Sequence, residues 1–467
     1  MTGRLVPAVL AAIACVYVAA GSAAAAEPRP RTPIQHFVSL MQENHSFDNY
    51  FGTYPGADGI PRSTCVPVNP RSKRAARDCV KPYRIGSRAI EDLGHSARIF
   101  RAQYRGGRMD GFVDAVKRQS GAVQPLVMGH YDARDLPYYW NVADEYVLFD
   151  RFFTSAHAGS VINHMYWVTA RPGNGTGDDI PPGGFHEPTI FERLEAKGIS
   201  WKFYVQHYDP RITFRSRELG DRGSQIVWVP LLGYPRFLDN PRLFRHIVPI
   251  EEFYADARRG TLPSVSYIVP SGSSEHPPGS IKAGETFVRT LITAVMRSKL
   301  WKSSAFTWTY DDWGGWYDHV RPPRVDRFGY GFRAPALLVS PWAKKGYIEH
   351  RTLDFTSLLK FIEENWGLGP LARRDREAQS IMSAFDFDQQ PRKAVFLDRV
   401  RDRVDARPPR RSAVYIGYSA ALLVAVGLIA AAALSDRRRP PLAGPSATLR
   451  IEPLAAAGPP ERGESPS

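Results

Sequence analysis

Strand-like apolar runs alternate with amphipathic helical segments through residues 27–395, and this alternation constrains the fold more than any other feature. Residues 34–41 are apolar with little polar interruption, which is typical of a strand buried on both faces. Similar runs are residues 199–205, 265–269, 306–310 and 334–340. Apolar residues recur at helical spacing at Val288, Leu291, Ile292, Val295 and Leu300, and a further helix is expected from Thr356 to Gly367. We predict one α/β domain with a mostly parallel central sheet and helices on both faces.

The two ends of the chain carry apolar segments of different kinds. Residues 1–26 place Arg4 before an apolar run and finish on three alanines, which is the order of a secretory signal. The mature chain is then expected to begin at Glu27, with an uncleaved anchor as the alternative. Residues 412–435 carry no charge and are long enough to cross a bilayer core of about 30 Å, so they are predicted to form a transmembrane helix.

Basic residues flank this second segment on both sides, in the linker 396–411 and at residues 437–439. The positive-inside rule is therefore ambiguous, and the secretory signal decides the orientation. It places the catalytic domain outside the cytoplasm and leaves residues 436–467 inside, as a tail whose Pro, Ala, Gly and Glu content indicates disorder. We predict a single-pass protein of the cell membrane.

The charge balance favours an acidic partner. The formal net charge is +14, so nucleic acid, anionic lipid and phosphorylated substrates all qualify. The basic residues are scattered among aromatic residues and prolines, which argues against nucleic acid. Cys15 lies in the signal segment, so Cys65 and Cys79 are left in an oxidising compartment. A disulfide is the expected state of this pair, and two free thiols are the alternative.

Polar residues follow two of the predicted strands at the point where each strand ends. Glu43 and Asn44 come directly after the first strand, and Asp311 and Asp312 come directly after residues 306–310. Functional groups of open α/β sheets collect beyond the carboxyl ends of the strands. Taken alone, the aspartates could be a solvated loop or a helix cap, and Glu43 an ordinary strand-end residue. Together, the four side chains offer hard oxygen ligands, and a cation would offset their mutual repulsion. They predict a site for a divalent cation.

The segment that begins with these residues also carries a resemblance to a known family. Residues 42–52, with the sequence QENHSFDNYFG, resemble the opening motif of the bacterial phospholipase C and acid phosphatase family of phosphoesterases. This family belongs to the alkaline-phosphatase-like superfamily. Further similar stretches, in the same order, are residues 94–96, 109–112, 131–139, 274–277, 311–320 and 331–346. The resemblance extends from about residue 33 to about residue 390, and it implies a metal-dependent hydrolase of phosphate esters.

The resemblance also implies roles for individual residues. Ser160 matches the nucleophile, at the start of a helix, with Ser155 as its rival. Without the resemblance, Ser160 would be interpreted as a helix N-cap. The implied reaction forms a phosphoserine, which water then hydrolyses, beside the cation held by Glu43, Asn44, Asp311 and Asp312. The resemblance implies that His95 and His276 contact the phosphate or protonate the leaving group. His207 follows a predicted strand and is expected to complete the phosphate site. Weaker candidates are His319, His157 and His164.

Three functions are compatible with these residues. A phospholipase C would cleave phospholipids at the glycerol side of the phosphate, and the basic, membrane-tethered chain slightly favours it. An acid phosphatase would take monoesters, and Gly159-Ser160 with Asn163-His164 resembles that branch more closely. The third function is an inactive protein that binds phosphorylated ligands. An inactive protein would be expected to have lost some of the site residues. However, Glu43, Asn44, Ser160, Asp311 and Asp312 are all present in the sequence.

Overall fold

A computed structural model describes residues 27–86, 90–173, 179–216 and 224–400, which belong to one compact unit. The predicted signal segment, transmembrane segment and tail lie outside these residues. Within the described part of the chain, no helix has both the length and the apolar character needed to span a membrane.

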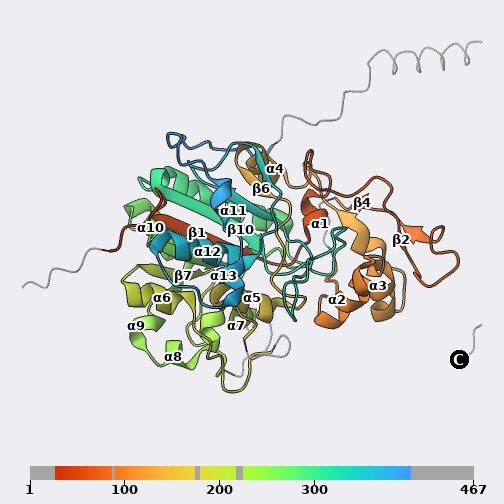
Figure 1. The fold of residues 1–467 in the computed structure, drawn as a ribbon, viewed down its shortest axis with the longest axis horizontal. Helices are drawn as coiled ribbons and strands as arrows, with labels where there is room; N and C mark the ends of the chain where they lie inside the picture. Colours follow the sequence, from red (N-terminus) through yellow and green to blue (C-terminus); the bar gives the residue numbers. More distant parts are fainter. Residues whose placement is uncertain (1–26, 87–89, 174–178, 217–223, 401–467) are drawn as a thin grey trace, which may run out of the picture. The chain divides into compact units, whose positions relative to one another are not determined.

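The centre of the fold is an eight-stranded sheet (Figure 1). In sheet order the strands are β12 (Tyr347–Glu349), β6 (Val147–Phe149), β11 (Ala336–Val339), β10 (Ser304–Tyr310), β1 (His36–Gln42), β9 (Val265–Val269), β7 (Trp201–Val205) and β8 (Ile247–Pro249). The five strands from β10 to β8 are parallel, and β12 is parallel to β6. Only β11 runs antiparallel to its two neighbours in this sheet. The predicted α/β class with a mostly parallel sheet is therefore confirmed.

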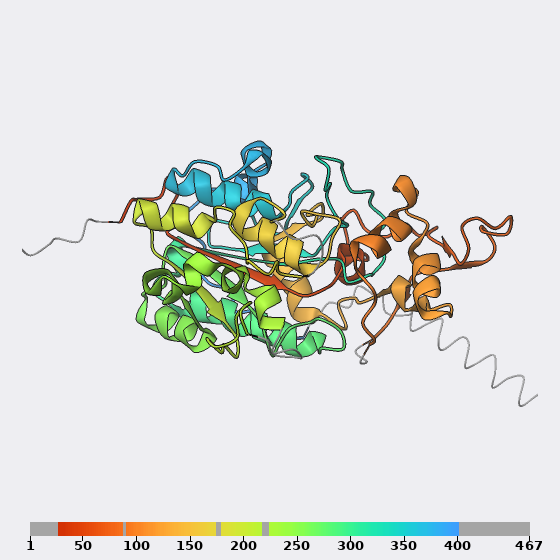
Figure 2. The same ribbon diagram turned by 90° about the horizontal axis from the view of Figure 1, so that it is seen from below.

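Helices cover both faces of the sheet, as predicted (Figure 2). One layer contains α5 (Ser160–Thr169), α6 (Ile190–Lys197) and α12 (Phe355–Trp366), and the other contains α10 (Ile250–Arg259) and α11 (Ile281–Arg297). The apolar residues predicted to line one face of a helix, from Val288 to Val295, are buried on α11. Helix α12 ends where the sequence predicts, because Gly367 adopts the left-handed conformation, with a φ of 65°, that terminates helices.

One region differs from the expectation. From its content of Arg, Pro and aromatic residues, the stretch 209–262 is predicted to be an elaboration over the active face. It does contain the short helices α7 (Ser224–Trp228), α8 (Pro235–Leu238) and α9 (Pro241–Phe244). However, it also contributes β8 and α10, which extend the sheet and its helical layer. The strand pattern is weak there because β8 has only three residues and ends at a proline.

A smaller group of elements lies beside the sheet (Figure 1). Its members are α1 (Phe47–Phe51), β2 (Val66–Pro67), β3 (Cys79–Val80), β4 (Tyr83–Arg84), α2 (Ala97–Tyr104), α3 (Phe112–Ser120) and β5 (Gly129–His130). The predicted disulfide is confirmed, since Cys65 and Cys79 are bonded with their Cα atoms 5.4 Å apart. The remaining helices are α4 (Pro137–Glu145) and α13 (Arg373–Glu377).

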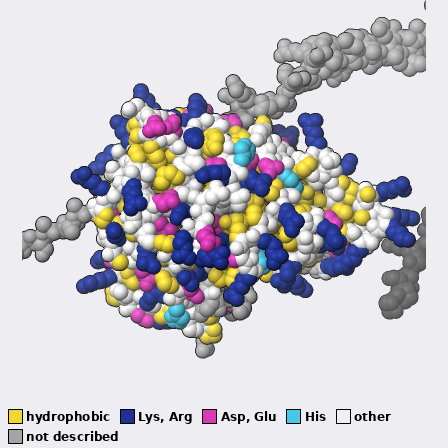
Figure 3. Space-filling view, viewed as in Figure 1, with side chains coloured by type: hydrophobic (Ala, Val, Ile, Leu, Met, Phe, Trp, Pro, Cys, Tyr) yellow, Lys and Arg dark blue, Asp and Glu magenta, His cyan; other side chains and the backbone are white. Residues whose placement is uncertain are grey.

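Basic side chains are spread over the face of the molecule drawn in Figure 3, with acidic and apolar side chains between them. A protein that binds nucleic acid would be expected to gather its basic residues in a stripe along one element. The distribution on this face agrees with the scattered pattern in the sequence.

Candidate active site

The pairing of β1 with β10 brings two acidic side chains together. The strands are parallel, with Gln42 opposite Tyr310, so the next residues, Glu43 and Asp311, emerge side by side at the carboxyl ends. A backbone hydrogen bond of 3.1 Å from Asp311 N to Gln42 O continues the ladder into this turn. Both side chains are buried, with 1% and 0% of their surface exposed. The sequence pattern predicts this convergence correctly.

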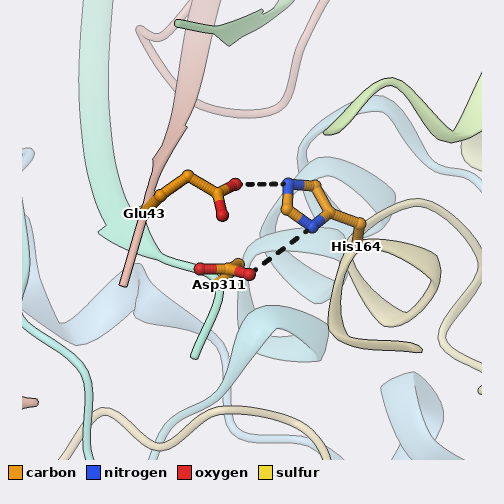
Figure 4. Close-up of side chains that lie close together, drawn as sticks. All are labelled: Glu43, His164 and Asp311. Carbon is orange, nitrogen blue, oxygen red and sulfur yellow. Dashed lines mark ion pairs between the residues drawn. The ribbon is translucent and has the colours of Figure 1, made fainter. Parts of the chain in front are cut away.

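Helix α5 adds His164 to the pair (Figure 4). Its Nε2 lies 3.3 Å from Glu43 Oε1, and its Nδ1 lies 3.9 Å from Asp311 Oδ2. One ligand atom from each residue fits within a group less than 4.8 Å across. Apart from these ion pairs with one another, both oxygens of each carboxyl group and the His164 Nε2 have no hydrogen-bond partner among the described residues. Buried polar atoms are almost always paired, so such a cluster of orphaned atoms points to a bound cation.

The electrostatics of the group support the same conclusion. Burial, followed by the charges of Asp311 and Asp312, raises the pKa of Glu43 well above its usual value. Burial and the neighbouring Asp312 likewise raise the pKa of Asp311. Burial lowers the pKa of His164 to about 4, which keeps the imidazole in the neutral form that binds metals. These residues therefore suit a divalent cation, which would offset the repulsion between the carboxylates.

Asn44 and Asp312 lie next to this group. Asn44 Nδ2 donates to Asp312 Oδ1 over 2.8 Å, and Gly314 N donates to the same oxygen over 2.7 Å. Gly314 has a φ of 59°, and a Cβ there would lie 2.1 Å from Asn44 O, so the close approach requires glycine. Within the part of the chain that the structure describes, the buried Asn44 Oδ1 has no hydrogen-bond partner. The four residues predicted as metal ligands thus lie together, and His164 joins them.

Ser160 is the first residue of α5, one helical turn before His164. Its Oγ donates to Asp312 Oδ2 over 3.5 Å. The N-cap is Gly159, so Ser160 is not the capping residue that its sequence context alone suggests. Asn163 steadies the preceding loop, since its Oδ1 accepts from Ala156 N over 3.0 Å. The hydroxyl thus lies at a helix N-terminus, where backbone N–H groups favour an anion.

The rival serine occupies a different environment. Ser155 Oγ donates to Asp354 Oδ2 over 2.8 Å and accepts from Phe355 N over 3.2 Å. Both partners belong to the start of α12, so this hydroxyl is committed to holding that helix. Between the two serines, Ser160 is the one beside the acidic group.

His95 and His276 face each other, with ring centroids 5.7 Å apart. Each ring is held by a backbone carbonyl, His95 Nδ1 by Leu93 O and His276 Nδ1 by Pro277 O, both at 2.7 Å. Burial lowers the pKa of His95, but the charges of Asp312 and then Asp92 outweigh it and raise the pKa to about 9. The neighbouring carboxylates therefore favour the protonated form of His95. The sequence prediction pairs these two histidines, and the structure brings them together.

The other histidines lie elsewhere. His207 follows β7, two strands away from β1, and lines a cavity of about 780 Å³ with Tyr208, Arg211 and Ser271. Its expected role in the phosphate site stays a prediction. His157 stacks on Phe100, with ring centroids 5.3 Å apart. His164 is the residue whose importance the sequence understates, because only the packing of α5 on the sheet reveals it.

His319 belongs to a buried ionic network behind the site. Arg333, with no exposed surface, lies 2.9 Å from Asp48 and 3.0 Å from Asp318, and His319 Nδ1 is 2.7 Å from Asp48 Oδ2. Arg333 also donates to the backbone oxygens of Asp58 and Asp150. The network joins α1 to the segment that follows Asp312, so its role is structural.

Arg333→Met is expected to lower the free energy of unfolding by about 3–5 kcal/mol, because it leaves the buried carboxylates without their counterion. Thermal unfolding followed by circular dichroism measures the change. The matched control is Arg373→Met, since Arg373 pairs with Glu377 on the exposed surface of α13, where water screens the ion pair, and its loss is expected to leave the free energy of unfolding close to that of wild type. Equal losses in the two variants would contradict the structural role of the network.

The family model described as "Phosphoesterase family" matches residues 34–369, which include every site residue described above. The chain belongs to the phosphoesterase family. It is therefore a hydrolase that acts on phosphate esters.

Curated relatives carry phospholipase names. The chain is 29% identical to phospholipase C A of Mycobacterium tuberculosis, over 78% of this chain and 79% of that protein. It is 28% identical to the hemolytic phospholipase C of Pseudomonas aeruginosa, over 74% of this chain and 55% of that protein. A plant relative, non-specific phospholipase C1 of Arabidopsis thaliana, is 26% identical over 77% of this chain and 72% of its own length.

Solved structures resemble this phosphoesterase more distantly. A protein of the alkaline phosphatase superfamily from Vibrio parahaemolyticus matches with a TM-score of 0.36 and 12% identity, covering 76% of this chain and 74% of that chain. At this level of similarity the match carries no argument about chemistry.

Proposed function

We propose that this phosphoesterase is a metal-dependent phosphodiesterase of the phospholipase C type, with Ser160 as its nucleophile. The observation that carries the proposal is the place of the Ser160 hydroxyl. It lies at the N-terminus of α5, beside Asp312 and the buried group of Glu43, Asp311 and His164. A divalent cation held by this group and by Asn44 would act as a Lewis acid toward the phosphate and the serine oxygen.

The residues of the chain account for the rest of the reaction. Asp312 accepts the proton of the Ser160 hydroxyl, and the serine oxygen attacks phosphorus in line and forms a new P–O bond. The bond to the leaving alcohol breaks, and protonated His95 donates its proton to the departing oxygen. His276, facing His95, would bind a phosphoryl oxygen. Water then attacks the phosphorylated serine and gives one proton to His95, now neutral, while Asp312 returns its proton to the departing Ser160 oxygen. Atoms and charges balance, and the enzyme returns to its starting state.

The names of the relatives support a phospholipid as the substrate, and the local sequence around Ser160 keeps the acid phosphatase alternative open. We expect the purified protein to hydrolyse p-nitrophenyl phosphorylcholine at least about tenfold faster, in kcat/KM, than p-nitrophenyl phosphate, since a diesterase site binds both substituents of phosphorus. Release of diacylglycerol from phosphatidylcholine vesicles extends the test to lipid. The reverse preference would identify a phosphatase, and hydrolysis of neither ester would support the inactive binding protein.

The cellular setting is part of the proposal. The signal segment at residues 1–26 and the apolar segment at residues 412–435 support an enzyme tethered to the cell membrane with its catalytic domain outside. This placement suits a lipid substrate, and the oxidising compartment suits the disulfide between Cys65 and Cys79.

A further inference from the structure

A buried glutamate behind the active site receives three phenolic hydroxyls. Glu275 follows β9 and has no exposed surface. Its Oε1 accepts from Tyr139 over 2.5 Å, and its Oε2 accepts from Tyr310 over 2.8 Å and also from Tyr50. On α11, Gly284 makes room for this side chain, because a Cβ there would lie 2.1 Å from Glu275 Cγ. The surroundings are thus shaped around one carboxyl group.

Each contact of Glu275 leads to a different part of the candidate site. Tyr310 is the last residue of β10, directly before Asp311. The backbone oxygen of Glu275 is 3.1 Å from His45 Nε2, on the segment that follows Asn44. The next residue along the chain is His276. Glu275 therefore connects the ends of β1 and β10 to His276, through its carboxyl group on one side and its backbone on the other.

A purely structural role is a poor explanation for a carboxyl group at this position. Burial raises the pKa of Glu275 to about 8, although the hydroxyls of Tyr139, Tyr50 and Tyr310 favour the charged form. Burying such a group is costly, and a well-packed apolar side chain in its place is often neutral or stabilising. An apolar side chain would not provide the three directional hydrogen bonds that fix α1, α4 and β10 relative to one another.

We propose that Glu275 is a positioning residue, which fixes Asp311 and His276 relative to Glu43 and thereby sets the geometry of metal and phosphate together. This inference rests on the proposed function, because it assigns Glu275 to the same site. Its action is indirect. Through Tyr310 it holds the end of β10 that carries Asp311, and through its own backbone it holds His276. Neither task requires Glu275 to touch the substrate.

The first test compares Glu275→Gln with a matched control. The amide keeps the size of the side chain but replaces one acceptor oxygen with a donor, which cannot accept from a tyrosine. We expect kcat to fall about tenfold or more, with KM changed by less than about threefold, because misplaced groups slow the chemical step. The control is Glu363→Gln, since Glu363 is also buried but accepts from Leu371 N at the C-terminal end of α12. Its kcat should stay within about twofold of wild type. An unchanged kcat in Glu275→Gln, or an equal loss in the control, would overturn the proposal.

The second test needs no catalysis, so it separates this inference from the proposed function. Binding of Mn²⁺ is measured by calorimetry in the full chain, without substrate. Tyr310→Phe removes one hydroxyl and is expected to weaken Mn²⁺ binding about tenfold, as loss of a partner behind the metal ligands does. Tyr254→Phe is the control, because Tyr254 bonds Thr290 between α10 and α11.

The outcomes of the second test are distinct. Weaker binding in Tyr310→Phe alone supports the role of Glu275 even if wild type hydrolyses neither ester. Equal Mn²⁺ affinity in Tyr310→Phe and wild type overturns it. If Glu275→Gln fails to fold, Tyr310→Phe still decides, because the change removes a single oxygen from the network.

Discussion

Replacing Ser160 with alanine is expected to reduce kcat for p-nitrophenyl phosphorylcholine by at least about a thousandfold, as removal of a catalytic nucleophile does in other enzymes. The physical reason is the loss of the oxygen that lies at the N-terminus of α5 beside Asp312. The fold should be unaffected, because Gly159, and not Ser160, occupies the N-cap. Initial rates with a chromogenic ester measure the effect, and the melting temperature verifies the fold.

Ser155→Ala is the matched control for this experiment. Ser155 is also buried and lies five residues before Ser160. It holds the start of α12 through hydrogen bonds with Asp354 and Phe355. Its loss should lower stability by about 1 kcal/mol and leave kcat within a factor of about two. A Ser160→Ala protein that retained normal turnover, or a Ser155→Ala protein that lost it, would reassign the nucleophile.

Removal of the metal is expected to abolish hydrolysis and to destabilise the protein, increasingly so as the pH rises. Without a cation, burial and mutual repulsion raise the pKa values of Glu43 and Asp311, so the folded metal-free protein holds protons that the unfolded chain releases. The contribution of these two carboxyl groups to the stability of the metal-free protein is fully present below about pH 4, where the carboxyls of the unfolded chain are also protonated. It is lost as the pH rises towards the raised pKa values. A bound cation prevents this loss. At a cation concentration of a hundred to a thousand times the dissociation constant, binding adds about 3–4 kcal/mol to the free energy of unfolding.

The measurement is the melting temperature with excess Mn²⁺ and with a chelator, from about pH 5 to about pH 8. We expect the gap between the two curves to widen with pH. The variant Asp311→Asn provides an internal check with the opposite sign. It should bind Mn²⁺ more weakly, yet without metal it should be more stable than wild type at high pH, because one of the repelling charges is gone. A constant gap, or a metal-free Asp311→Asn protein less stable than wild type, would contradict the cation site.

The acidic half of the candidate site can be predicted from the sequence because it depends on strand ends. Glu43 and Asp311 each follow an apolar run, and parallel strands place such residues at one edge of the sheet. His164 cannot be predicted in the same way. Its position depends on how α5 packs against β1 and β10, which helical periodicity does not specify. The choice between Ser155 and Ser160 has the same origin, since it requires knowing which hydroxyl α12 already uses.

The order of strands in the sheet is also beyond sequence patterns. His207 follows a genuine strand, but that strand lies two places from β1, and strand order sets this distance. The antiparallel direction of β11 and the contribution of β8 are decided by tertiary pairing as well. Glu275 shows a related limit. Its motif resembles the family, but only the convergence of tyrosines from α1, α4 and β10 shows what the carboxyl group does.

In the proposed reaction the Ser160 oxygen becomes covalently bonded to phosphorus. Rapid acid quench during turnover of p-nitrophenyl phosphorylcholine, followed by mass spectrometry of the peptide that contains Ser160, tests it directly. We predict a fraction of this peptide carrying phosphorylcholine on Ser160, with none in the Ser160→Ala protein. A modification on another residue, or turnover with no modified peptide and a direct attack by water on the substrate, would contradict it.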